Sequence, residues 1–186
     1  MKAINIDSKS NKSGGKKMII RQETSQDYNE VYDAIKEAFK EAEHRDGTEQ
    51  DLVAALRKGE GFIPELSLVA EADGKIAGHI MFTEGKVGGD RVLVLAPLSV
   101  VPEFQKQGVG SALIKEGHRI AKELGYEYSL VLGSEVYYPR FGYVPAVQFG
   151  VELPEGMPSA NFMAIKLQDN DKTISGPVTY AKEFGI

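Results

Sequence analysis

The 186-residue chain contains no cysteine. This absence excludes disulfide bonds, a thiolate nucleophile and metal sites built on cysteine. It is compatible with a cytoplasmic protein, which is the location we expect. The three histidines, His44, His79 and His118, are scattered and do not have the spacing of a zinc site. We therefore expect no bound metal.

The sequence also lacks any apolar run near the 18 or so residues that suggest a membrane span. Its first residues, MKAINIDSKSNKSGGKK, lack the apolar region of a signal peptide. A net charge of -5 and a pI of about 5.3 disfavour a general nucleic-acid binder. We expect neither a membrane nor a nucleic acid as partner, and a monomer or homodimer. The length fits one domain over residues 18–186, preceded by a flexible tail over 1–17.

Hydrophobic periodicity predicts alternating helices and strands. Capping-box patterns at Thr24–Asp27 and Thr48–Asp51 each precede a helical pattern. An Asp-Gly turn at Asp73-Gly74 predicts a hairpin. We expect an α/β fold whose N-terminal strands are antiparallel, with a parallel pair around a crossover helix and helices flanking the sheet. The expected strands are 18–22, 66–71, 75–82, 91–100, 128–132, 147–151 and 162–167, with a helix over 108–124 and a short element over 137–141.

A turn with two glycines, VVPEFQKQGVGSALI, links a strand to the helix over 108–124. Glycine is a poor helix former, so Gly108 and Gly110 at a helix start indicate that something approaches the backbone closely. The first N–H groups of a helix lack internal partners and lie at the positive end of its dipole. The unit is therefore suited to an anion such as phosphate. A tight turn that only begins a helix is the alternative.

The form of this turn excludes two common nucleotide sites. Leu113 stands where the dinucleotide fingerprint needs a third glycine, and no Gly-Lys-Ser/Thr follows as a P-loop requires. The string V-x-P-x-x-Q-x-x-G-x-G-x-x-L runs from Val100 to Leu113. It closely resembles the acyl-CoA-binding motif of the GNAT superfamily of N-acetyltransferases.

A second motif supports the resemblance. Tyr138 lies four residues before the pair Gly142-Tyr143, as in the second signature of GNAT proteins. The run LGSEVYYPRFGYVPA resembles a bacterial branch of predicted acetyltransferases. The resemblance extends from about Met18 to the C-terminus and implies a GNAT-like fold with acetyl-CoA as co-substrate.

The resemblance implies where acetyl-CoA binds. Backbone N–H groups of the turn would hold the pyrophosphate, and Lys106 could add a positive charge. The strand Leu98-Ser99-Val100 would pair with the pantetheine arm, and the Val100 N–H would stabilise the thioester oxyanion. The residues of the turn are Gln105, Lys106, Gln107, Gly108, Val109, Gly110 and Ser111.

The resemblance also implies direct attack of a deprotonated amine on the thioester. Tyr138 matches the general-acid tyrosine that hydrogen-bonds the leaving thiolate, whereas its neighbour Tyr137 fits an aromatic that packs under the sheet. No motif identifies the base: Glu84 is the first candidate, and Glu49 is an alternative that could face the substrate amine. We expect His118 to be solvated and His79 to lie in the core or the cleft.

The acceptor is an unknown amine. By family analogy, the two N-terminal helices and the loops after Phe82 and Val144 should wall its site. The carboxylates expected around it, Glu43, Asp46, Glu49 and Glu84, favour a cationic amine. A non-catalytic acyl-CoA-binding module that regulates a partner is the alternative function. Only the enzyme needs a leaving-group donor and a base.

Overall fold

The computed structural model describes residues 4–6, 18–40 and 47–185. One nine-stranded sheet runs through it in the order β1-β2-β3-β4-β5-β6-β8-β7, with β9 paired to β4. The pair β5–β6 is parallel and the other named pairs are antiparallel, which confirms the expected mixed sheet. The strands are β1 Ile4–Ile6, β2 Met18–Gln22, β3 Phe62–Ala72, β4 Lys75–Val87, β5 Asp90–Val100, β6 Tyr128–Leu132, β7 Val144–Pro145, β8 Phe162–Lys166 and β9 Val178–Thr179. The helices are α1 Tyr28–Phe39, α2 Glu49–Leu56 and α3 Val109–Glu123, with 3-10 turns η1 Pro102–Phe104, η2 Tyr138–Phe141, η3 Ala146–Phe149 and η4 Lys182–Phe184.

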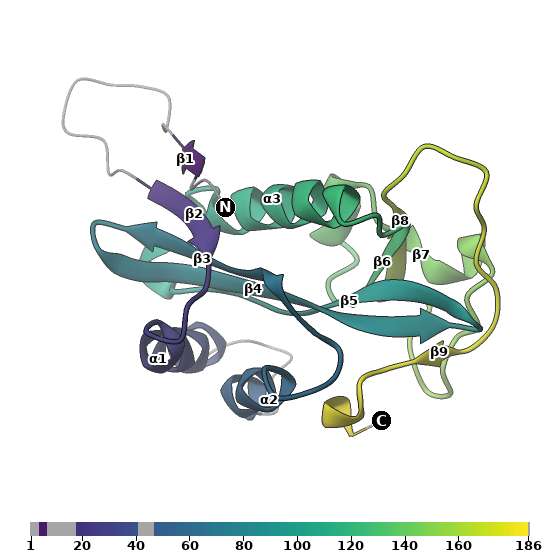
Figure 1. Ribbon diagram of the computed structural model, residues 1–186, viewed down its shortest axis with the longest axis horizontal. Coiled ribbons are helices and arrows are strands. Elements are labelled where there is room, and N and C mark those ends of the chain that lie inside the picture. Colours follow the sequence, from purple (N-terminus) through teal and green to yellow (C-terminus); the bar gives the residue numbers. More distant parts are fainter. Residues whose placement is uncertain (1–3, 7–17, 41–46, 186) are drawn as a thin grey trace.

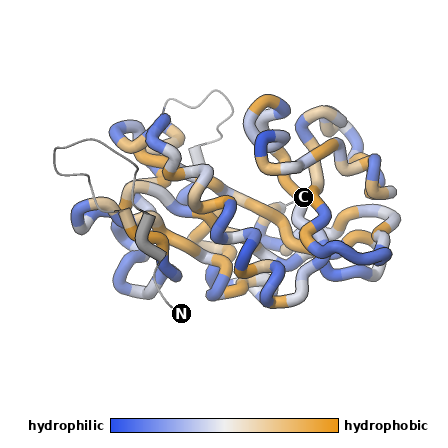
Figure 2. The backbone as a smooth tube through the Cα atoms, turned by 90° about the horizontal axis from the view of Figure 1, so that it is seen from above, coloured by the Kyte–Doolittle hydropathy of each residue, from blue (hydrophilic) through white to orange (hydrophobic). Residues whose placement is uncertain are grey.

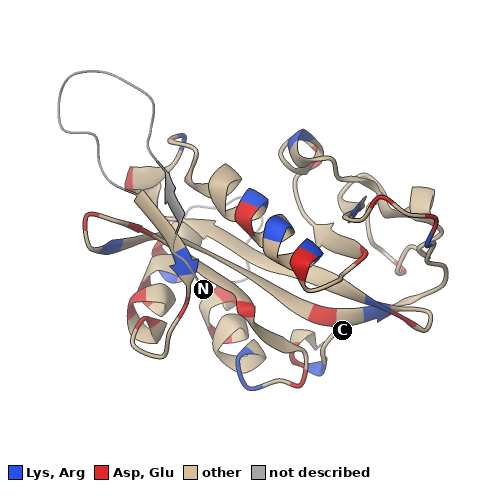
Figure 3. Ribbon diagram, turned by 45° about the horizontal axis from the view of Figure 1, so that its top comes forward, with Lys and Arg blue, Asp and Glu red and all other residues tan. Residues whose placement is uncertain are grey.

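The helices cover the sheet on both faces, with α3 on one side and α1 and α2 on the other (Figure 1). Helix α3 buries Leu113, Ile114 and Ile120 against the sheet. Lys, Arg and Glu recur along α3, whereas charged residues are sparse along the long central strands (Figure 3). The helix is therefore amphipathic, as its sequence period predicts.

The hydrophobic core lies around the central strands, because these strands consist mainly of apolar residues. The central strands form a hydrophobic band, whereas hydrophilic and hydrophobic residues alternate along α3 (Figure 2). Strand β4 is buried along most of its length because helices cover both of its faces. Helix α1 is anchored at its start by the Thr24 N–H, which donates to the Asp27 carboxylate over 2.7 Å.

Strand β5 separates from β6 near the two-glycine turn. It pairs with β6 only at Leu93, Val94 and Leu95. Its ladder with β4 shifts register between Leu95 and Leu98, which leaves Ala96 and Pro97 as a bulge. Proline has no N–H to donate, so it is tolerated at such a break. The sheet therefore opens between the ends of β5 and β6.

Two expectations on strands need correction. Residues 147–151 do not form a strand: the chain makes the short strand β7, then the 3-10 turn η3, and only Val151 makes an isolated bridge, to Gly176. Pro145 and the left-handed Gly150 break the apolar run at its two ends. Residues 4–6 form β1 within the segment expected to be a tail, and they pair with β2.

Candidate active site

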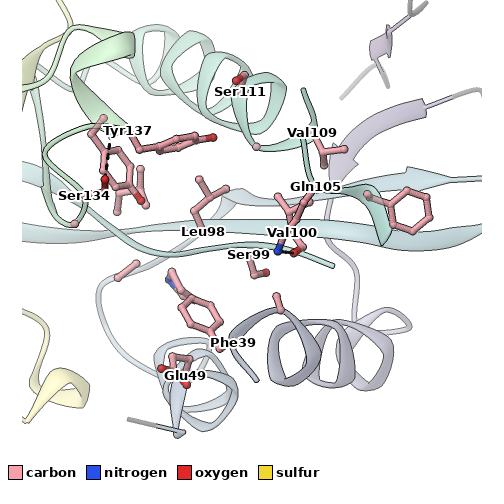
Figure 4. A pocket seen from close by; sticks show the side chains of 18 of the residues that line it. Phe39, Glu49, Leu98, Ser99, Val100, Gln105, Val109, Ser111, Ser134 and Tyr137 are labelled. Carbon is pink, nitrogen blue, oxygen red and sulfur yellow. Dashed lines mark hydrogen bonds between the residues drawn. The ribbon is translucent and has the colours of Figure 1, made fainter. Parts of the chain in front are cut away.

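A cavity of about 790 Å³ lies at the opening between β5 and β6. Its walls come from β5, the start of α3, the end of β6 with η2, and the helices α1 and α2 (Figure 4). The structure thus brings together two motifs that are 30 residues apart in the sequence. The expected residues that line it are Glu49, Leu98, Ser99, Val100, Gln105, Lys106, Gly108, Val109, Gly110, Ser111 and Tyr138.

Gln107 is the one residue of the expected turn that does not line this cavity. Its side-chain amide donates to the carbonyl of Glu103 over 2.7 Å. The side chain therefore braces the turn from outside. The neighbouring Gln105 donates to the Val100 carbonyl over 3.1 Å, and this bond is drawn in Figure 4.

The free edge of β5 faces the cavity. The Val101 N–H donates to the carbonyl of Ala77 on β4, and residues of an antiparallel strand alternate in the edge to which they point. Since Val100 pairs with Gly78 in the next register position, its N–H and carbonyl point away from β4. Among the described strands, none pairs with this edge beyond Leu95. An extended ligand could pair there.

The two-glycine turn has an unusual backbone. Gly108 is the N-cap of α3 with φ +87°, and Lys106 has φ +60°. Left-handed residues flanking Gln107 turn successive N–H groups toward one side, which is typical of anion-binding loops. A Cβ built on Gly108 would meet nothing within 4 Å, and the first turn of α3 contains no acidic residue. The turn therefore presents donors to open space without a competing carboxylate.

Gly110 is required for a different reason. A Cβ there would lie 2.6 Å from the hydroxyl of Tyr137 and 3.5 Å from Val100 Cγ2. The absence of a side chain thus lets Tyr137 reach across the start of α3 (Figure 4). Burial raises the pKa of Tyr137, while the Ser111 hydroxyl and the Arg140 charge oppose that rise.

Tyr138 and Tyr137 both line the cavity. Their rings meet edge to face, with centroids 5.4 Å apart, and the Tyr138 ring also meets Tyr143 edge to face at 5.6 Å. The backbone of Gly133 lies directly against Tyr138, with no room for a Cβ. Burial raises the pKa of Tyr138, so its hydroxyl keeps its proton at neutral pH. The expectation that Tyr137 only packs under the sheet missed its place in the cavity wall.

One side of the cavity is formed by α1 and α2. Phe39 and Glu49 face β5 from below in the close-up (Figure 4). Glu49 is thus the expected carboxylate that the fold places in the wall. The expected Glu43 and Asp46, like His44, lie outside the described residues.

Glu84 lies away from the cavity. Its carboxylate accepts hydrogen bonds from Arg91 and Tyr126, each over 2.7 Å. Burial tends to raise the pKa of Glu84, but these two donors outweigh it and lower the pKa. A carboxylate held by a guanidinium and a hydroxyl outside the cavity cannot serve as the base there.

The remaining histidines are both structural. His118 is not solvated as expected: its Nε2 lies 3.0 Å from the Tyr143 hydroxyl, and burial lowers its pKa to about 4. It is therefore neutral at pH 7. Its position in a helix with charged neighbours hid this contact, since the contact forms only when η2 packs on the sheet.

His79 belongs to a buried polar cluster that the sequence did not reveal, formed with Glu23, Arg57 and Ser67. Ser67 Oγ donates to Glu23 over 2.6 Å and lies 3.1 Å from His79 Nε2. Arg57 pairs with Glu23, and its guanidinium stacks over the ring of Tyr28 at 4.2 Å. The cluster ties the end of α2 to β3, β4 and the start of α1, and so positions the helices that carry Glu49.

The chain is similar to known acetyltransferases. Residues 28–143 match the model of the acetyltransferase (GNAT) family. A relative from Escherichia coli strain K12, named uncharacterized N-acetyltransferase YjhQ, is 38% identical over 141 residues, which are 72% of this chain and 78% of that protein. The uncharacterized N-acetyltransferase YhbS of the same strain is 31% identical over 140 residues, covering 73% of this chain and 83% of the relative.

Two solved structures are similar over nearly the whole chain. A GNAT family acetyltransferase from Brucella melitensis, in complex with acetyl-CoA, has a TM-score of 0.74 and 31% identity, covering 90% of this chain and 97% of that one. YhbS from Escherichia coli, in complex with CoA, has a TM-score of 0.82 and 27% identity, covering 95% and 97%. Within residues 4–6, 18–40 and 47–185, no helix is long and apolar enough to cross a membrane. The same residues contain no group of three metal-ligating side chains.

Proposed function

Because the chain belongs to the GNAT family of acetyltransferases, we propose that it transfers the acetyl group of acetyl-CoA to a primary amine by direct attack. The amine nitrogen bonds to the thioester carbonyl carbon, the carbon–sulfur bond breaks, and CoA leaves as a thiol. The amine loses its proton to a base or to water. One observation carries the proposal: the free edge of β5, the two-glycine turn and Tyr138 line the same cavity.

The two-glycine turn fits a pyrophosphate. The first N–H groups of α3 have no partner within the helix, and a Cβ built on Gly108 would meet nothing within 4 Å. Lys106 adds a positive charge at the same wall. We assign these residues to the phosphates of acetyl-CoA and the edge Leu98-Ser99-Val100 to its pantetheine arm, by strand-like pairing.

Val100 and Tyr138 would act on the reacting thioester. The Val100 N–H faces the open edge, so it can donate to the carbonyl oxygen as negative charge develops there. Tyr138 keeps its proton because of burial and would donate a hydrogen bond to the leaving sulfur. A thiol has a pKa near 8.5, well below that of a buried tyrosine, so stabilisation of the thiolate is a better description than full proton transfer.

Glu49 is our proposed contact for the acceptor amine. It lines the cavity from α2, opposite the edge of β5. A carboxylate there would attract an ammonium group and could accept its proton directly or through water. Glu49→Gln is expected to raise KM for a cationic amine while the affinity for acetyl-CoA stays unchanged. Glu84→Gln, which alters a carboxylate outside the cavity, is the control.

The first test is the melting temperature with and without acetyl-CoA, using ATP and NAD as controls. A ligand at one hundred times its Kd stabilises by about 2.7 kcal/mol, which raises the melting temperature of a chain this size by about 5–11 °C. A rise with acetyl-CoA alone supports the binding assignment. The absence of a rise at millimolar acetyl-CoA would contradict it.

The second test separates an enzyme from a binding module. Tyr138→Phe is expected to lower turnover at least tenfold, with little change in the affinity for acetyl-CoA. The adjacent Tyr137→Phe is the matched control for loss of one hydroxyl from the same wall. Release of CoA is measured with a thiol reagent, which the cysteine-free chain does not consume. Binding of acetyl-CoA without turnover of any amine would favour the regulatory module.

A further inference from the structure

A second cavity, of about 180 Å³, lies next to the active-site cavity. The two cavities share three wall residues, Leu95, Ala96 and Leu132. These residues stand where β5 and β6 separate, since the parallel ladder between the strands ends at Leu95. The second cavity therefore borders the active site at the point where the sheet opens.

The wall of this second cavity is apolar. From the sheet come Val94, Leu130 and Phe162, and from outside the sheet come Met157, Tyr180 and Phe184. No lining residue carries a charge. In contrast, the wall of the larger cavity includes Glu49, Lys106 and Arg140. A ligand that spans both cavities would have one polar end and one apolar end.

The C-terminal segment closes the second cavity. Strand β9 pairs with the end of β4, and η4 contacts α2, so the segment between them crosses the sheet on the α1–α2 face (Figure 1). The rings of Tyr180 and Phe184 pack together with centroids 5.7 Å apart. This cavity thus lies on the same side of the sheet as Glu49.

One polar atom is buried in this wall. The Tyr180 hydroxyl is inaccessible to solvent and has no hydrogen-bond partner in the described part of the chain. Burial raises the pKa of Tyr180 to about 12, so the group is a neutral hydroxyl. A buried polar group without a partner costs free energy. A ligand group that hydrogen-bonds to it would remove that cost.

We propose that the second cavity binds the body of the acceptor, and that the acceptor is a primary amine on a short chain bearing one ring-sized apolar group. This inference rests on the proposed acetyl transfer. The volume fits, since an apolar protein cavity of about 150 Å³ binds benzene. The ammonium group lies on the Glu49 side, the ring enters between β5 and β6, and a polar ring substituent meets Tyr180. A longer acyl chain of the co-substrate is the competing occupant, but it has no group to bond Tyr180.

The test compares ethylamine, 2-phenylethylamine, tyramine and cadaverine as acceptors with acetyl-CoA. We expect kcat/KM for 2-phenylethylamine to exceed those for ethylamine and cadaverine at least tenfold. Tyramine should exceed 2-phenylethylamine severalfold, and Tyr180→Phe should abolish that advantage. Equal use of all four amines, or a preference for cadaverine, would overturn the inference while leaving acetyl transfer intact.

A cavity-filling variant localises the effect. Met157→Trp introduces a large ring from a half-buried loop position, and Leu153→Trp places the same ring at an exposed position of that segment that lines neither cavity. Only Met157→Trp should reduce kcat/KM for 2-phenylethylamine to the level of ethylamine, with ethylamine itself unaffected. Loss of activity toward both amines alike would overturn the assignment of the cavity.

Two further readouts separate the possible failures. Saturation-transfer NMR in the presence of CoA measures the binding of 2-phenylethylamine without turnover, and Met157→Trp should abolish the signal. Preference for hexanoyl-CoA over acetyl-CoA with ethylamine would assign the cavity to the acyl chain and overturn the proposal. If acetyl-CoA gives no melting shift and no amine releases CoA, the proposed function fails, and this inference fails with it.

Discussion

Arg57→Met is expected to remove a large part of the stability of the fold. The side chains of Arg57 and Glu23 are only 7% and 1% exposed. Burial lowers the pKa of His79, so this residue is neutral at pH 7 and Arg57 is the cation that balances Glu23. Methionine keeps much of the volume of arginine but leaves the carboxylate buried without a countercharge.

The size of this loss of stability follows from the burial of the Arg57–Glu23 ion pair. Removing one partner of a buried ion pair costs about 3–5 kcal/mol. At about 2–4 °C per kcal/mol for a chain of this size, the melting temperature should fall by about 6–20 °C. An exposed pair is different: Lys40→Met, which alters the pair with Glu37 at the end of α1, should cost about 1 kcal/mol or less.

The same cluster predicts acid sensitivity. Burial alone would raise the pKa of Glu23, but the neighbouring His79, 3.7 Å away, and hydrogen bonds from Arg57 and Ser67 lower it from 4.5 to about 2. Because the pKa is lower in the folded state, the stabilisation is complete above pH 4.5 and is lost as the pH falls from about 4.5 to about 2. Glu23→Gln should therefore flatten the loss of stability over this range.

The assay is thermal and urea denaturation followed by circular dichroism, for the single variants and for Glu23→Gln/Arg57→Met. The double variant should be more stable than Arg57→Met, because the unpaired charge is then absent. A melting temperature for Arg57→Met within 3 °C of the parent, or a double variant less stable than Arg57→Met, would refute the reasoning.

Two glycine substitutions test the turn. Gly108→Ala places a Cβ at φ +87°, which costs about 1–2 kcal/mol of stability. It should also weaken acetyl-CoA binding severalfold, as measured by titration. The control Gly89→Ala, which has open space around it, should change neither the stability nor the binding. Gly110→Ala sets a methyl group 2.6 Å from the Tyr137 hydroxyl, so it should lower turnover, and Tyr137→Phe should restore part of it. No rescue would show that the methyl group acts elsewhere than on that hydroxyl.

Local sequence patterns predicted much of the fold. The helical period placed α1, α2 and α3, and the Asp73-Gly74 turn placed the β3–β4 hairpin. The expected strand over 147–151 was wrong because a short apolar run has no clear period, and Pro145 and Gly150 at its ends allowed a compact turn instead. Propensity alone does not distinguish these two outcomes.

The candidate site likewise has features that the sequence predicts and features that it does not. The two-glycine turn is readable because it depends on residue type at fixed spacing, whereas the role of the β5 edge was expected only from the resemblance to GNAT proteins. Side-chain partners are not readable, because they depend on which segments the fold brings together. Glu84 looked available in the sequence but faces Arg91 and Tyr126. The Glu23 cluster, by contrast, joins residues up to 56 positions apart and left no local signal.

The opening between β5 and β6 divides the sheet into two blocks. Of the ladders between named strands, only the three residue pairs of that parallel seam join β6, β7 and β8 to the rest. Val100 sits on one block and Tyr138 follows the last strand of the seam on the other. The two groups proposed to act on the thioester therefore lie on different blocks, which the packing of Tyr137 against Gly110 also joins.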